Sequence, residues 1–115
     1  MSIIHGEATA VVSRMLAAPC LHGWRVTVLE GPVDGRETSA QIVIEYETRR
    51  ATLTVSPHYA TRCINTLDEI VAHEIGHIVV GDVFEYIEPS RARDEACETL
   101  AERVGLAILA LTGDE

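Results

Sequence analysis

The sequence predicts an α+β fold in one domain, with an N-terminal helix, three strands and two further helices. Apolar residues recur at helical spacing near both ends of the chain and alternate with polar residues in its middle. Turn-forming residues separate these segments. A chain of 115 residues can bury one hydrophobic core but has no room for a second domain. Residues 1–115 are therefore taken as a single domain.

Residues 3–18 form the first predicted helix. Ser2 is a candidate N-cap, and Pro19 ends the helix because proline has no amide hydrogen to donate. The apolar residues of this segment fall on one side of a helix: Ile4, Ala8, Val11, Val12, Met15 and Leu16.

Three strands are predicted between residues 24 and 55. Residues 24–29, 40–47 and 51–55 alternate apolar and polar side chains, as a strand with one buried face does. Gly31-Pro32 ends the first strand. A short polar turn around residues 48–50 joins the second and third strands, which predicts an antiparallel hairpin. We expect a mostly antiparallel sheet.

A capped helix is predicted from Thr66 to Gly81. Thr66 and Glu69 have the spacing of a capping box, in which each side chain bonds an amide that the first turn leaves free. Gly81 fits a C-terminal stop. The apolar residues between these ends recur at helical spacing: Leu67, Ile70, Val71, Ile75, Ile78 and Val79.

The last helix is predicted over residues 92–111, after Pro89-Ser90 and before Gly113. Its predicted buried side consists of Ala96, Leu100, Val104, Ala107, Ile108 and Leu111. Its acidic residues include Asp94, Glu95, Glu98 and Glu102.

The capped helix contains His73-Glu74-Ile75-Gly76-His77, a His-Glu-x-x-His motif. Histidines four residues apart lie one above the other on a helix, so both rings can reach one cation. Glu74, between them, can reach a water on that cation. Zn²⁺ is the expected cation, and the alternative is a helix with two ordinary histidines.

A catalytic zinc needs a third protein ligand and one open position for water. The last helix offers Glu95 and Glu98, which lie about one turn apart. The glutamate that does not bind the metal could accept a hydrogen bond from a histidine ring. Asp82 is a weaker candidate and better fits a polar residue at a helix end. Cys97 fits a small buried residue better than a ligand.

These motifs resemble gluzincin metallopeptidases, in which a glutamate on the next helix completes the zinc site. Asp94-Glu95-Ala96 is similar to the Asn-Glu-Ala of thermolysin-like enzymes. Residues 73–82 followed by Glu95-Ala96-Cys97 resemble the ImmA/IrrE family, although Asp82, Cys97 and Thr99 replace its usual His, Asn and Phe. The resemblance implies a zincin-like fold with Glu95 as the third ligand.

The same resemblance implies a zinc-dependent endopeptidase that acts on a peptide or protein, such as a helix-turn-helix regulatory protein. Two neutral imidazoles and one carboxylate leave a net charge of +1 at the site, which favours activation of a water. Glu74 would then be the general base. Tyr86, His58 and Tyr59 are candidate donors to the tetrahedral intermediate. The resemblance also implies that strand 40–47 or 51–55 holds an extended substrate, and so small a chain predicts a shallow, open cleft.

A zinc-stabilised interaction or sensor module without turnover is the alternative function, with the metal tying the last two helices together. A formal charge of −9 and the absence of a Lys/Arg-rich run argue against nucleic acid or an anionic membrane as a partner. Neither a secretory leader nor a membrane span is predicted. The widely spaced Cys20, Cys63 and Cys97 fit reduced thiols, so we expect a cytoplasmic protein.

Overall fold

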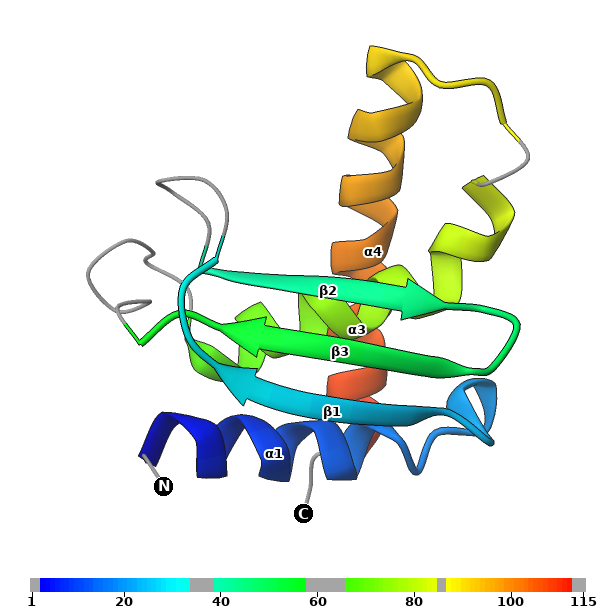
Figure 1. Ribbon diagram of the computed structural model, residues 1–115. Helices are drawn as coiled ribbons and strands as arrows, with labels where there is room; N and C mark the ends of the chain where they lie inside the picture. The colour runs from blue at the N-terminus through cyan, green and yellow to red at the C-terminus, as the bar shows by residue number, and fades with distance from the viewer. Residues whose placement is uncertain (1–2, 34–38, 58–65, 85–86, 113–115) are drawn as a thin grey trace.

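The computed structural model describes residues 3–33, 39–57, 66–84 and 87–112, which form an α+β fold (Figure 1). The order of helix, three strands and two helices is as predicted. The elements are α1 (Ile3–Met15), a 3₁₀ turn (Pro19–Leu21), β1 (Arg25–Glu30), β2 (Ala40–Glu45), β3 (Arg50–Val55), α3 (Leu67–Phe84) and α4 (Arg91–Thr112). The first helix ends three residues before its predicted end, where tighter turns begin.

The sheet is mixed, which corrects the expectation of a mostly antiparallel one. Its strand order is β1-β3-β2. β2 and β3 form the predicted antiparallel hairpin, with Ala40 opposite Val55, whereas β1 runs parallel to β3, with Arg25 opposite Arg50. β3 is the central strand of the sheet. Its inner face is accordingly well buried, and Leu53 and Val55 are fully enclosed there.

The helices lie on one face of the sheet. In Figure 1, α3 runs behind the strands and α4 crosses behind α3, reaching beyond the edge formed by β2. α1 packs against α3 and β1. The largest fully buried side chains lie between these layers: Met15, Leu21, Leu53, Ile75, Val55 and Val71. On the opposite face of the sheet, Val43 is 61% exposed.

The helix α3 begins as the capping box predicts. The Thr66 amide donates to Glu69 Oε1 at 2.9 Å, and the Glu69 amide donates to Thr66 Oγ1 at 3.2 Å. The predicted stop at Gly81 is wrong, because the helix continues to Phe84. Gly81 instead makes room for Tyr46, whose hydroxyl would overlap a Cβ at that position. This hydroxyl donates to the His77 carbonyl at 3.2 Å.

The buried side of α4 differs from the predicted one. Ile108 is buried and Val104 is partly buried, but Leu100 is 41% exposed and Leu111 is 86% exposed. Ala96 and Ala107 are exposed as well. The residues that α4 buries are Ala101, Gly105 and Ile108.

Two glycines decide this choice of face. A Cβ built at Gly76 would overlap the Ala101 carbonyl oxygen, and one built at Gly105 would overlap the Ala72 carbonyl oxygen. The backbones of α3 and α4 are therefore in direct contact, which larger side chains would prevent. The small residues of α4 set its orientation, and part of its apolar surface stays exposed.

No helix in the described ranges has the length and hydropathy needed to cross a membrane.

Candidate metal centre

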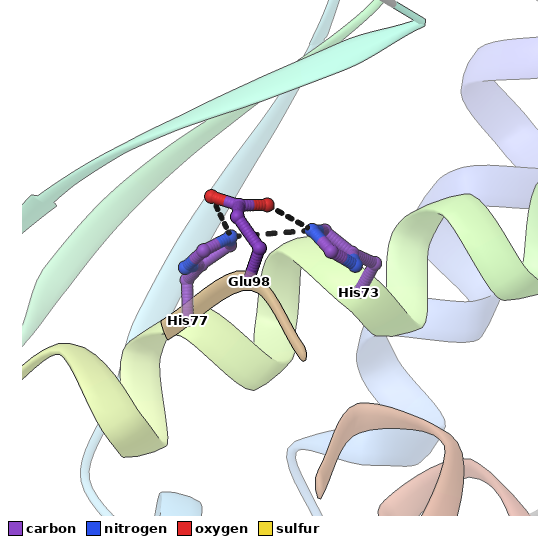
Figure 2. A group of neighbouring side chains, drawn as sticks. All are labelled: His73, His77 and Glu98. Carbon is purple, nitrogen blue, oxygen red and sulfur yellow. Dashed lines mark hydrogen bonds and ion pairs between the residues drawn. The ribbon is translucent and has the colours of Figure 1, made fainter. Parts of the chain in front are cut away.

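Two histidines of α3 and one glutamate of α4 converge on a common point (Figure 2). His73 Nε2 lies 2.8 Å from Glu98 Oε1, and His77 Nε2 lies 3.3 Å from Glu98 Oε2. The two Nε2 atoms are 3.3 Å apart. A tetrahedral zinc with bonds of about 2.0–2.1 Å spaces its ligand atoms by about 3.3 Å. Both the donor set and its spacing therefore fit zinc.

The helical spacing of the motif explains the histidine pair. His73 and His77 stand one turn apart on α3, and their ring centroids are 4.9 Å apart. Their side chains are 23% and 17% exposed, so both rings are shielded but reachable. Burial lowers the pKa of His77, more than the neighbouring Glu98 carboxylate raises it. His77 is thus held in the neutral form that binds metals.

The structure brings Glu98, and not Glu95, to the histidines, whereas the resemblance implied Glu95 as the third ligand. Glu95 is exposed, and its Oε2 lies 3.3 Å from Arg91 Nε. Because α4 faces α3 through Ala101, the helical period places Glu98 about 60° around the helix from that contact and Glu95 about 120°. Of the two glutamates that the residues left open, geometry favours Glu98.

The outer nitrogen of each histidine also has a neighbour on α4. Glu102 Oε1 lies 3.5 Å from His73 Nδ1, and Cys97 Sγ lies 3.9 Å from His77 Nδ1. A histidine that binds a metal through Nε2 carries its proton on Nδ1, where a carboxylate can accept it and orient the ring. Sequence reasoning missed this role of Glu102. The sequence signal for this role was that Glu102 follows Glu98 by four residues, which places both on the same face of the helix.

Glu74, which follows His73 on α3, has a strongly raised pKa. Burial raises its pKa from 4.5 to about 7, the nearby His73 opposes this, and the negative charge of Glu98 adds to it. A carboxyl group of this kind exchanges its proton near neutral pH. Such a pKa suits a general base or acid.

A cleft of about 500 Å³ opens beside these side chains. Glu74, His77 and Glu98 line it on one side, and β2 lines it on the other. β2 is an edge strand, so no described strand pairs with its outer edge. Ser56 donates its amide to the Ser39 carbonyl at 2.8 Å. Because bonded and non-bonded pairs alternate along an antiparallel ladder, Ala40, Ile42 and Ile44 turn their amides and carbonyls outward.

The predicted donors for a tetrahedral intermediate, His58, Tyr59 and Tyr86, lie outside the described residues, and so does the side chain of Asp82. Tyr46, which sequence reasoning did not consider as a site residue, lines the cleft instead. The signal for this role in the sequence was weak, because Tyr46 is the last apolar residue of the alternating segment 40–47.

Comparison with protein-family models, with curated proteins and with solved structures found no match.

Proposed function

We propose that the protein is a zinc-dependent endopeptidase with His73, His77 and Glu98 as the metal ligands. The observation that carries the proposal is the convergence of these three side chains, whose ligand atoms all lie within 4.8 Å of one another. Two histidines and one glutamate are a known ligand set for catalytic zinc and leave a fourth position for water or substrate. When bound, zinc would polarise the substrate carbonyl and make water a stronger nucleophile.

Glu74 is the general base in this proposal. It precedes His77 by three residues on the same helix and lines the cleft with it. From this position it can take a proton from the attacking water and later give it to the leaving amine. The Glu102 carboxylate next to His73 Nδ1 holds that ring in the orientation that presents Nε2.

The open edge of β2 is the proposed binding place for the substrate backbone. A peptide laid along it would gain main-chain hydrogen bonds from Ala40, Ile42 and Ile44, which depend little on the peptide's side chains. The opposite wall of the cleft carries Glu74 and two of the proposed ligands, His77 and Glu98. The scissile bond would therefore lie between the strand and α3. A regulatory protein, which the resemblance implies, is the proposed source of this segment.

One observation favours a non-catalytic function as a second candidate. Glu98 belongs to the first part of α4, where most side chains are exposed. A metal held by Glu98 and the two histidines would tie this part of α4 to α3. A zinc-stabilised interaction or sensor module would need the three ligands but not Glu74.

Metal analysis and hydrolysis together test the proposal. Wild type purified with zinc should carry about one zinc, Glu98→Gln should lose it, and Glu95→Gln should keep it. Zinc-loaded wild type should cleave members of a peptide pool, and Glu74→Gln should bind zinc normally but cleave at least 100-fold more slowly. A wild type that takes up no zinc would refute the metal site. Zinc binding with no cleavage by wild type would favour the interaction module.

A further inference from the structure

A second hollow extends the metal-site cleft toward the β2–β3 turn. It has a volume of about 830 Å³, and the two hollows share Ile44 and Tyr46 in their walls. Ile78 and Val79, which follow His77 directly on α3, line it as well. A peptide lying along β2 past the metal site would therefore continue into this hollow.

The floor of the hollow is apolar and fixed in place. Trp24 and Tyr46 meet edge to face, with ring centroids 5.7 Å apart and an angle of 86° between the planes. Such aromatic pairs are favourable beyond the area they bury. The hydrogen bond from Tyr46 to the His77 carbonyl holds the pair against α3. Ile44 and Val79 complete a surface that suits a large apolar side chain.

The rim of the hollow is acidic. Glu45 and Glu47 are exposed there, and Arg49 is the one lysine or arginine among the described residues that line either hollow. The Arg49 guanidinium is turned to the His22 carbonyl, to which it donates at 3.1 Å. Glu74 and Glu98 add further acidic groups on the metal side. A positively charged side chain is therefore favoured beside the apolar one.

We propose that this hollow selects the substrate, and that it accepts a segment in which a large apolar residue stands next to a lysine or arginine. The preference applies to one side of the scissile bond, the side that lies toward the β2–β3 turn. The inference rests on the proposed peptidase function. It adds the substrate class, which the metal site alone does not specify.

Trp24 makes occupancy of the hollow measurable, because it is the only tryptophan in the chain. Tryptophan-free peptides that contain Lys-Leu, Glu-Leu or Lys-Ser are titrated into zinc-loaded Glu74→Gln, which should bind without cleaving. The Lys-Leu peptide should change the Trp24 emission saturably. It should bind about threefold more tightly than the Glu-Leu peptide, and this difference should vanish at about 1 M salt. The Lys-Ser peptide should bind more weakly than Lys-Leu because it lacks the apolar side chain.

A charge reversal tests the rim. Added to the Glu74→Gln form, Glu47→Lys should remove or invert the preference for Lys-Leu over Glu-Leu. Glu7→Lys is the matched control, since Glu7 is exposed on α1 and lines neither hollow, and it should leave the preference unchanged. Equal binding of all three peptides, or an unchanged preference in Glu47→Lys, overturns the inference.

Cleavage profiles separate this inference from the function on which it rests. Zinc-loaded wild type and Glu47→Lys, both with Glu74 intact, digest one pool of natural peptides, and the cut sites are read by mass spectrometry. An apolar residue next to a basic one should be enriched on one side of the cut in wild type, and the basic preference should be lost in Glu47→Lys. Cleavage without this enrichment refutes the substrate class alone. No cleavage by wild type refutes the peptidase function and the inference with it.

Discussion

Replacing Gly76 with alanine tests whether backbone contact between α3 and α4 sets the metal site. The new Cβ would overlap the Ala101 carbonyl oxygen and would lie 2.8 Å from the Ala101 carbonyl carbon and 3.0 Å from the Gly105 nitrogen. Carbon atoms pack at about 3.5–4.0 Å, so the two helices must move apart by about 1 Å. This movement carries Glu98 away from His73 and His77.

The expected free-energy change has two parts of opposite sign. Alanine improves helix propensity by about 1 kcal/mol over glycine. Overpacking costs about 1–3 kcal/mol or more when the clashing atoms belong to the backbone and cannot move to another rotamer. We expect Gly76→Ala to lower the free energy of unfolding by about 1–2 kcal/mol and to weaken zinc binding at least tenfold.

Gly6→Ala is the matched control for Gly76→Ala. Gly6 is also helical, but a Cβ at that position meets nothing within 4 Å. This variant should gain about 0.5–1 kcal/mol, because only the propensity changes. Urea denaturation gives both stabilities, and titration with a competing chelator gives the zinc affinities. Wild-type stability and zinc affinity in Gly76→Ala would refute the argument that backbone contact positions the ligands.

Three further predictions concern single side chains. Because burial raises the pKa of Glu74 from 4.5 to about 7, Glu74 should remove up to about 3 kcal/mol of stability from the metal-free protein as the pH rises from 4.5 to 7, and the lowered pKa of His77 acts in the opposite direction. Glu74→Gln should therefore be more stable than wild type at pH 8 but not at pH 4 in urea denaturation, and equal stabilities at pH 8 would contradict this. Glu102→Gln should weaken zinc binding by about 10–100-fold, measured by competition with a chelator, because it removes the carboxylate beside His73 Nδ1; an unchanged affinity would show that this carboxylate does not orient the ring. Thr66→Ala should cost about 1 kcal/mol in thermal or urea unfolding, since it removes the acceptor for the Glu69 amide, and no loss would mean that the capping box contributes nothing.

Local signals in the sequence predicted the elements and two of the three residues of the candidate metal site, His73 and His77. The capping box of Thr66 and Glu69, the β2–β3 hairpin and the histidine pair depend on residues within a few positions of one another. Their geometry follows from the helical or strand period alone. The structure places His73 and His77 in a group of side chains that could hold a metal ion. This supports the predicted metal site, whereas the identity of the metal as Zn²⁺ stays a prediction.

The parts that sequence reasoning missed depend on contacts between distant segments. Glu95 and Glu98 lie on one helix, and only its rotation against α3 decides which of them meets the histidines. Gly76 and Gly105 set that rotation, yet a helical glycine looks locally like a weak helix former. The role of Gly81 was missed for the same reason, since its partner Tyr46 lies in the β2–β3 turn, 35 positions earlier.

The open edge of β2 has a consequence for the behaviour of the protein in solution. An edge that can accept a peptide can also accept the same edge of a second molecule, which is a route to self-association. The formal charge of −9 at pH 7 keeps molecules apart by repulsion. Near the isoelectric point of about 4.9 this repulsion disappears, so solubility should be lowest there. The acidic surface thus opposes pairing of the β2 edge with the same edge of another copy of the chain.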